Sequence, residues 1–419
     1  MPKLKKFKYK PLSLKDIITE MKENLDLMID LAYSAIRFQS KEIADEVRKI
    51  EERIHELVFL IDLQAMMAHP GFQAAKSIEP IVRVGYAIDK ISDALADIAK
   101  VTYINDDIWV FTQYMWGAIP EPIIKVTISP ESEIAGQLVS EINFRPKHGV
   151  DLIAIRRNMR WIYYPYPEER IIGEDRIIVR GDMQNLVHIK KLCRDTAPIS
   201  FKFEGEEKTS SLDFNAPELK EIMPKIKKTY IQMIDISETM IQLAIGAAFF
   251  NNYEVAEDVL EMEELMDGLN IIFEKQILDL AKNVPSSRDI VGIVRIGFCC
   301  ELISDAASHI AEMIIKGFST HPILVQAIKE TSEILLRERV SSQSKFRDIT
   351  YKDMLEQYQL GVYVIAVKRG ENWIYDYKKD FTFKEGDLLI GLGPRDTVIQ
   401  WHKLVNPERC MIYQEKKKK

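Results

Sequence analysis

The amino-acid sequence contains one long segment twice. Residues 81–100, IVRVGYAIDKISDALADIAK, return at 293–312 as IVRIGFCCELISDAASHIAE, with ten of twenty positions identical. The same offset of 212 residues links further identical pairs, including Ala44 with Ala256, Val47 with Val259, Glu51 with Glu263, Ala154 with Ala366, Trp161 with Trp373, Asp175 with Asp387 and Gly181 with Gly393. An offset kept through helix-like and strand-like segments indicates that a whole multidomain unit was duplicated. We therefore expect two similar arms.

The composition is typical of a protein that folds in water. The chain has 419 residues, 47% hydrophobic and 29% charged, which is enough to bury several cores of ordinary domain size. Its most apolar stretches, such as residues 240–250, are shorter than the roughly 18 residues that a membrane-spanning helix needs. The basic N-terminus is not followed by an apolar segment of the kind found in signal peptides. We therefore expect a cytoplasmic protein without a membrane span.

Charge excludes one class of partner and suggests another. The net charge of −7 argues against nucleic-acid binding, because neutralising phosphates requires a concentrated excess of Lys and Arg. Basic residues gather at the two ends, at Lys3, Lys5, Lys6, Lys8 and Lys10 and at 416–419. Each such charge contributes about 1 kcal/mol near an anionic membrane surface. The ends are therefore either solvated tails or a means of holding the protein at the inner face of the membrane.

The four cysteines, Cys193, Cys299, Cys300 and Cys410, have neither C-x-x-C spacing nor the pattern of a disulfide framework. This usage fits a reducing compartment. We interpret them as core-filling thiols in preference to redox groups.

Each arm changes its periodicity partway along. Apolar residues first recur every three or four positions with charges opposite, which predicts an antiparallel bundle of long helices. Ser40 is the expected N-cap of the second helix. The predicted helices cover residues 14–38, 41–67, 74–101 and a short aromatic segment at 109–116 in the first arm, and 231–250, 255–280 and 290–316 in the second.

After Pro122 the period falls to two, which predicts a small α+β domain in each arm. The expected strands are IIKVTI, VDLIAI, WIYY and RIIVRG in the first arm, with helices at 132–142 and 182–194, and GVYVIAVK, NWIYDY and DLLIGLG in the second, with a closing helix at 395–404. The predicted division is a helical bundle at 1–118, a small domain at 119–197, a linker at 198–217, a second bundle at 218–330, a second small domain at 331–408 and a basic tail at 409–419.

These patterns resemble two known families. ISDALADIAK and ELISDAASHIAE are similar to the signature helix of the PhoU family, the helical-bundle regulators of phosphate uptake. GVDLIAIRR with EDRIIVRG, and GVYVIAVKRG with KEGDLLIGLG, resemble TrkA-C, the C-terminal regulatory domain of potassium channels and transporters, also called RCK_C. Glu174 stands where a glycine is expected before Asp175, so we expect that turn to differ.

The resemblance covers almost the whole chain, in the order PhoU, TrkA-C, PhoU, TrkA-C. It implies an α+β multidomain fold, internally duplicated, in which PhoU-like antiparallel helical bundles alternate with small α+β TrkA-C domains. Such potassium regulators often carry a nucleotide-binding Rossmann domain, but no G-x-G-x-x-G follows a strand here and no Walker A motif is present. We therefore expect neither a nicotinamide site nor an ATP site.

Paired carboxylates are the residues with the greatest capacity for chemistry. Residues four apart share a helix face, so Glu263 and Asp267 on one helix can converge with Glu301 and Asp305 on the next. Four carboxylates in a bundle need a cation. The PhoU resemblance implies the same four residues, because members of that family bind iron or zinc clusters at such pairs.

The first arm offers Glu51, His55, Asp89 and Asp93 at the matching positions. An imidazole at His55 favours zinc, iron or nickel over magnesium. The predicted cofactor is therefore a divalent or ferric ion. In both arms the alternative is that these residues form only helix caps and salt bridges on a solvated face.

Catalysis by such a site is not expected. A ferritin-like di-iron enzyme needs two E-x-x-H motifs and two further glutamates on a four-helix bundle. Only residues 52–55 have that spacing, and a site built from Glu52 would compete with the face that carries Glu51. A metal-dependent helical-bundle enzyme therefore remains an outlying alternative.

The TrkA-C resemblance implies a second site. Pairs of such domains form dimers, and some bind a small anionic regulator, such as a cyclic dinucleotide, between them. Guanidinium groups and aromatic faces suited to that ligand occur at Arg156, Arg157 and Trp161, and in the second copy at Lys368 and Arg369. Alternation along a strand places Arg156 and Arg157 on opposite faces, and we expect Arg157 and Trp161 at a strand edge. The alternative is a charged edge that prevents aggregation.

Together these patterns predict a cytoplasmic, non-enzymatic regulator of cation transport, with potassium as the favoured ion, that senses a metal or a small anionic ligand. Its expected partner is a membrane cation channel or transporter, and exposed bundle faces with TrkA-C pairing suggest a homodimer. A PhoU-type regulator of phosphate uptake is the alternative.

Overall fold

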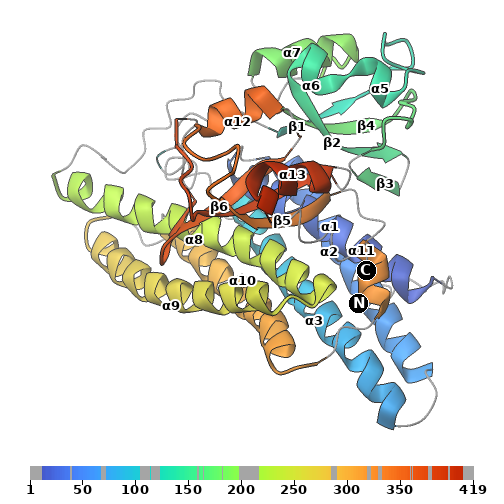
Figure 1. Cartoon of the computed structure of the whole chain (residues 1–419). Coiled ribbons are helices and arrows are strands. Elements are labelled where there is room, and N and C mark those ends of the chain that lie inside the picture. The colour runs from blue at the N-terminus through green and yellow to red at the C-terminus, as the bar shows by residue number, and fades with distance from the viewer. Residues whose placement is uncertain are drawn as a thin grey trace, which may run out of the picture.

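The two arms form two bundles of long helices and two small β-sheets in the computed structural model (Figure 1). The structure describes residues 12–37, 40–67, 72–103, 114, 123–157, 160–163, 165–181, 183–197, 217–284, 290–318, 322–328, 333–358, 360, 362–375, 380–394 and 397–408. The short aromatic helix predicted at 109–116, the basic tails and Cys410 lie largely or wholly outside these ranges.

The first bundle consists of α1 (Leu14–Arg37), α2 (Lys41–Met67) and α3 (Phe72–Lys100), followed by the 3₁₀ turn η1 (Val101–Tyr103). These helices match the predicted ones closely. The Ser40 hydroxyl accepts a hydrogen bond from the Ile43 amide at 3.3 Å, which confirms Ser40 as the N-cap of α2.

The second bundle consists of α8 (Pro217–Phe250), α9 (Tyr253–Ala281) and α10 (Val291–Ile315), followed by the short α11 (Pro322–Ile328). Helix α8 begins well before the predicted start at residue 231. The predicted start was wrong, because the helix continues through Pro224. Leu219, Met223 and Ile226 extend its buried stripe on both sides of the proline.

Equivalent helices of the two bundles meet. Helices α3 and α10, which carry the repeated segment, pack side by side (Figure 1). The hydroxyls of Tyr33 in α1 and Ser237 in α8 hydrogen-bond to each other at 2.9 Å in the buried interior. One hydrophobic core runs through both bundles and into the second small domain, so the two arms form one packed body.

Glycines in the repeated segment let neighbouring helices approach closely. A Cβ atom added at Gly297 in α10 would lie 2.3 Å from a ring carbon of Phe273 in α9, and one at the equivalent Gly85 in α3 would lie 3.0 Å from the Ile61 side chain in α2. Both helical hairpins are therefore tightly packed at this point, and this closeness brings polar residues on facing helices within reach of one another.

Each small domain contains a four-stranded antiparallel sheet of the same topology. The first has the order β1 (Ile123–Thr127), β4 (Arg176–Gly181), β2 (Val150–Arg157), β3 (Arg160–Tyr163), and the second has the order β5 (Glu333–Arg339), β8 (Leu388–Pro394), β6 (Tyr363–Arg369), β7 (Asn372–Ile374). Even the register shift recurs, between Leu152 and Ala154 in one sheet and between Val364 and Ala366 in the other. The predicted repetition of an α+β domain is confirmed.

Short helices surround the sheets at α5 (Val139–Ile142), α6 (Phe144–His148), α7 (Met183–Leu192), α12 (Tyr351–Tyr358) and α13 (Val398–Val405). The prediction of one helix over 132–142 was wrong, because residues 130–136 are turns. Strand β5 was missed because its charged residues hide the alternation. Strand β2 is an interior strand, so the prediction that Arg157 lies at an edge was also wrong, whereas Trp161 does lie on the edge strand β3.

The turn before the buried Asp175 keeps its shape without a glycine. Glu174 has φ 70°, and the equivalent Gly386 has φ 89°, so both adopt the left-handed conformation. Our expectation that this turn differs between the arms was wrong. An L-residue in that conformation is strained by roughly 1–2 kcal/mol.

One helix meets the length and composition of a membrane span, contrary to the prediction. The segment Leu219–Phe250 in α8 contains an 18-residue window that is apolar enough, but 78% of this window is buried inside the protein. Its apolar surface is thus already covered by neighbouring helices and the second small domain.

Three cysteines pack in the interior as free thiols: Cys193, Cys299 and Cys300. Burial raises the pKa of the Cys193 thiol to about 12, so the reactive thiolate form is disfavoured. This confirms the interpretation of these residues as core-filling thiols.

Candidate metal centre

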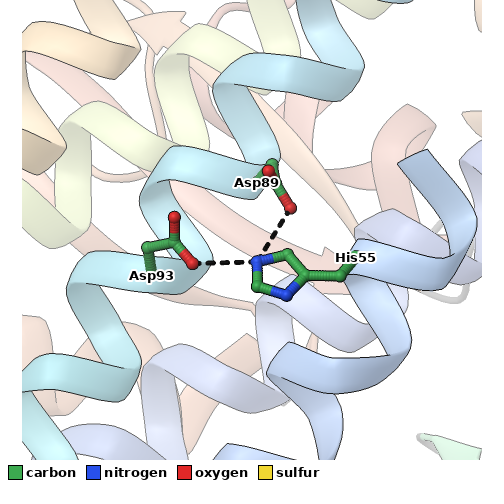
Figure 2. Close-up of side chains that lie close together, drawn as sticks. All are labelled: His55, Asp89 and Asp93. Carbon is green, nitrogen blue, oxygen red and sulfur yellow. Dashed lines mark hydrogen bonds and ion pairs between the residues drawn. The ribbon is translucent and has the colours of Figure 1, made fainter. Parts of the chain in front are cut away.

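Three of the predicted metal ligands come together on the first bundle. The His55 Nε2 atom on α2 lies 2.9 Å from an oxygen of Asp93 and 3.3 Å from an oxygen of Asp89, both on α3 (Figure 2). One ligand atom from each residue falls within 4.8 Å of the other two. Within the described ranges no other group of three His, Cys, Asp or Glu side chains meets this criterion.

Helix periodicity explains this convergence. Asp89 and Asp93 lie one turn apart, and the flanking Ile88 and Ile91 point into the core and fix the rotation of α3. The close approach of α2 and α3 then sets His55 opposite the two carboxylates.

Asp89 is the least solvated member of this group. Burial raises the pKa of its carboxyl, and the neighbouring His55 partly offsets this effect. One Asp89 oxygen, Oδ1, is enclosed and has no hydrogen bond of acceptable geometry among the described residues, although His55 Nε2 is 3.3 Å away. A buried carboxylate oxygen without a hydrogen bond is costly, and either a proton or a metal ion would satisfy it.

Glu51, the fourth predicted ligand of the first arm, is engaged elsewhere. Its carboxylate lies 3.4 Å from the Lys100 ammonium, and burial raises its pKa. His55, Asp89 and Asp93 would give a metal three protein ligands and leave open positions for water. Such a set of one imidazole and two carboxylates suits zinc or iron.

The second arm has a carboxylate where the first has its imidazole. Asp267 occupies the position of His55, so Glu263, Asp267, Glu301 and Asp305 are all acidic. Burial first and then the charge of Asp267 raise the pKa of Glu301 to about 7. Burial and the charges of Asp267 and Asp305 also raise the pKa of Glu263. In the absence of a metal, these carboxylates therefore raise one another's pKa values.

The predicted anion-binding residues form ion pairs within the protein. Arg156 pairs with the buried Glu46 of α2. Arg157, which the alternation of β2 turns to the other face, donates to the buried Asp175 at 2.9 and 3.0 Å and to Glu169 at 2.8 Å. The side chain of Trp161 lies outside the described residues.

The second arm repeats this arrangement. Lys368 pairs with Glu261 and lies 5.3 Å from the centre of the Trp373 ring. Arg369 donates to the buried Asp387 at 2.7 and 2.8 Å. Arg157 with Asp175 and Arg369 with Asp387 are therefore the same ion pair at the 212-residue offset.

A cavity of about 580 Å³ lies beside Lys368, between α9 and the second sheet. Its lining carries five carboxylates, Glu254, Glu257, Asp258, Glu261 and Glu338, and three cationic groups, Arg337, Arg339 and Lys368. The surplus of acid favours a cation over an anionic ligand at this place.

Sequence reasoning missed the ion pairs that join each bundle to its sheet. In the first arm Glu42 and Glu46 of α2 pair with Lys125 and Arg156 of the sheet. In the second arm Arg337 of the sheet pairs with both Glu254, at 2.8 Å, and Asp258, at 2.9 Å. All four positions recur at the same offset, a signal that was present in the sequence.

Comparison with known proteins identifies the domains. The sequence model of the PhoU domain matches residues 18–102 and 230–314. The model of the TrkA-C domain matches residues 123–194, which contain the first sheet. The second small domain has the same strand order. No curated protein matches the chain.

Solved structures give weak global matches. The chain is 10% identical to the GsuK RCK domain, with a TM-score of 0.18 over 69% of this chain and 64% of that one. It is 8% identical to the GsuK channel bound to NAD, with a TM-score of 0.18 over 69% of this chain and 53% of that one. It is 15% identical to S. agalactiae BusR in complex with its busAB-promotor DNA, with a TM-score of 0.17 over 42% of this chain and 96% of that one.

Proposed function

The chain is a tandem PhoU and TrkA-C protein, and on this premise we propose that it is a non-enzymatic regulator of potassium transport. It acts in the cytoplasm as a homodimer on a membrane cation channel or transporter. The signal that it transmits is the binding or release of metal by its helical bundles. Both kinds of domain are regulatory modules and not enzymes, and the TrkA-C domain is the part that points to potassium.

One observation supports a regulatory coupling more than any other. Helix α2 carries His55 of the candidate metal group and, near its N-terminus, Glu46, which pairs with Arg156 of the first sheet. A change in α2 on metal binding would therefore act directly on the TrkA-C domain. Helix α9 has the same two connections, because Asp267 lies in the acidic group and Asp258 pairs with Arg337 of the second sheet.

Regulation of phosphate uptake is the second candidate. It is favoured by the PhoU match, which covers both arms, whereas the TrkA-C model matches one. A small anionic ligand at the sheet cations has less support, because those cations already bind carboxylates within the chain.

The test compares cells with and without the protein. Potassium influx and phosphate uptake are measured in the same cultures, and the deletion strain is complemented with wild-type protein or with Arg156→Gln, which cuts the connection between α2 and the first sheet. Glu56→Gln, an exposed position on α2, is the matched control. We expect deletion and Arg156→Gln to alter potassium influx and Glu56→Gln to restore it. Unchanged potassium influx with altered phosphate uptake would favour the second candidate.

A further inference from the structure

A cavity of about 220 Å³ lies where the two arms meet, outside the candidate metal centre. Its walls come from α1, from α8 and from the second sheet, which lies across these helices (Figure 1). Positions that correspond at the 212-residue offset face each other across it, namely Asp26 with Glu238 and Asp30 with Gln242. The cavity thus lies between equivalent helices of the two arms, where a ligand would contact both arms at once.

The charge of the lining is strongly negative. Asp26, Asp30, Asp235 and Glu238 contribute four carboxylates, and Lys22 contributes the one cationic group among the lining residues. Lys22 is already paired with Asp26. Outside the lining, Arg180 of the first sheet also acts electrostatically on Asp30, but it lies 3.5 Å from Asp151. Burying several carboxylates together costs free energy unless a cation is bound beside them.

Two lining groups lack partners within the described part of the chain. The phenol oxygen of Tyr375 has less than 1 Å² of exposed surface and no hydrogen bond. The Asp30 side chain is partly buried, burial raises the pKa of its carboxyl, and it has no hydrogen bond or ion pair within 4 Å among the described residues. Groups of this kind in a polar cavity are satisfied by a bound molecule.

The spacing of the oxygens restricts the ligand. No three carboxylates of this cavity bring ligand atoms within 4.8 Å of one another, as direct coordination of a bare divalent ion requires. The volume is equivalent to roughly seven water molecules, and Ile29, Ile365 and Leu392 add apolar wall. These dimensions fit a cation that reaches the carboxylates through its own hydrogen-bond donors.

We propose that this cavity binds a small cation with several hydrogen-bond donors, held by Asp30, Glu238 and the Tyr375 hydroxyl at the junction of the two arms. A hydrated potassium ion and a small alkyl diammonium ion share this chemistry. The inference deepens the proposed function, because such a ligand would hold the two bundles and the second sheet in one arrangement and so give the regulator a second input.

Binding is measured on the purified full chain by thermal unfolding and titration calorimetry, in choline chloride of constant ionic strength with the metal centre stripped by chelator. Potassium chloride, sodium chloride and putrescine are the probes. We expect a saturable rise in Tm with potassium chloride, with putrescine or with both. Comparison of the responses to the three probes shows whether the bound cation is an inorganic ion or a diammonium ion. No saturable response to any of the three probes would refute the proposal.

Two variants locate the site. Asp30→Asn with Glu238→Gln should weaken the binding at least about tenfold, because two charge-assisted hydrogen bonds are lost. Tyr375→Phe tests the third contact without changing charge, and should weaken binding while leaving the unliganded protein at least as stable. The matched control, Asp45→Asn with Glu56→Gln, removes two carboxylates from the exposed face of α2 and should leave the response intact. Equal binding in wild type and both cavity variants would contradict the assignment. These measurements need no transporter, so they stand apart from the outcome in cells.

Discussion

Arg157 donates two hydrogen bonds to the buried carboxylate of Asp175, from Nε at 3.0 Å and from Nη2 at 2.9 Å. The same guanidinium donates to the carbonyl oxygen of Arg170, and in the second arm Arg369 donates in the same way to Asp387 and to the carbonyl oxygen of Thr382. The arginine and the aspartate of the repeated sequence pattern are thus partners of each other. Their recurrence reflects the stability of the small domain.

Arg157→Ala should therefore destabilise the first small domain strongly. The substitution leaves Asp175, which is 1% exposed, as a buried charge with backbone donors alone. Breaking such a pair from one side costs about 3–5 kcal/mol, and partial exposure of Arg157 places this case near the lower end. The free energy of unfolding in urea is the measurement.

Arg347→Ala is the control, because Arg347 pairs with exposed Glu385 at 3.5 Å on the surface of the other small domain. Surface pairs of this kind contribute about 0–1 kcal/mol. If Arg157→Ala cost no more than this control, Asp175 would not depend on Arg157.

The repeat made the fold largely predictable, because each arm could be checked against the other. Both bundles followed from periodicity, as did the limits of their long helices to within a few residues, except the start of α8, and seven of the eight strands that the structure describes. Prediction failed where local composition opposed the tertiary structure. Strand β5, EILLRER, carries charge because Arg337 reaches two carboxylates on α9, and α8 continues through Pro224 because burial of its apolar face outweighs the local penalty.

Glu174→Gly should stabilise the protein. Glu174 has φ 70°, where an L-residue is strained by roughly 1–2 kcal/mol. Glycine relieves that strain but loses about 0.5–1 kcal/mol of chain entropy on folding, so a net gain of about 0.5–1 kcal/mol is expected. The midpoint of urea unfolding would show it.

The second arm supplies the reverse substitution. Gly386→Ala, at φ 89° and with nothing within 4 Å of an added Cβ atom, should lose about 1 kcal/mol through strain alone. The same direction of change for both substitutions would show that turn geometry is not the cause.

The metal-free protein should lose stability as the pH rises from about 4.5 to about 7. Burial, with Asp267 as the main charged neighbour, raises the pKa of Glu301 from 4.5 to about 7. The folded state therefore holds a proton that the unfolded state releases, so this contribution is complete below the unfolded pKa and is lost as the pH passes through the folded one. The loss is less than about 3 kcal/mol, because solvent reaches part of the site.

Unfolding curves collected across this pH range, in chelator, test the prediction. Glu301→Gln should flatten the decline. Glu312→Gln, on the exposed side of α10 where Lys316 lowers the pKa of Glu312, should leave it in place. A decline that persists unchanged in Glu301→Gln would assign it to another group.

The candidate metal centre was only partly readable from sequence. Helical spacing identified which carboxylates share a face, and this correctly brought Asp89 and Asp93 to His55. Spacing did not reveal that Glu51 pairs with Lys100 and not with the candidate metal group, because that pairing depends on the rotation of α2 against α3. The same limit applies to Arg156 and Lys368 of the sheets, whose carboxylate partners lie on α2 and α9.

Exchanging the residues at one position between the arms should exchange their metal affinities. Asp267→His gives the second arm the imidazole that His55 supplies in the first, and it removes the carboxylate that acts most strongly on Glu301. We expect the pKa of Glu301 to fall and zinc binding to the second arm to tighten, because imidazole is a favoured zinc ligand and brings no negative charge. Calorimetry with zinc and the pH dependence of unfolding measure the two effects.

His55→Asp is the reciprocal change. It should weaken zinc binding in the first arm and raise the pKa of Asp89 further, because a third carboxylate replaces the group that now offsets the effect of burial. Opposite changes in zinc affinity for the two substitutions would support metal binding at equivalent places in both bundles. If neither exchange changes zinc affinity while both shift the carboxyl pKa values, the acidic groups act on each other electrostatically and do not form a zinc site.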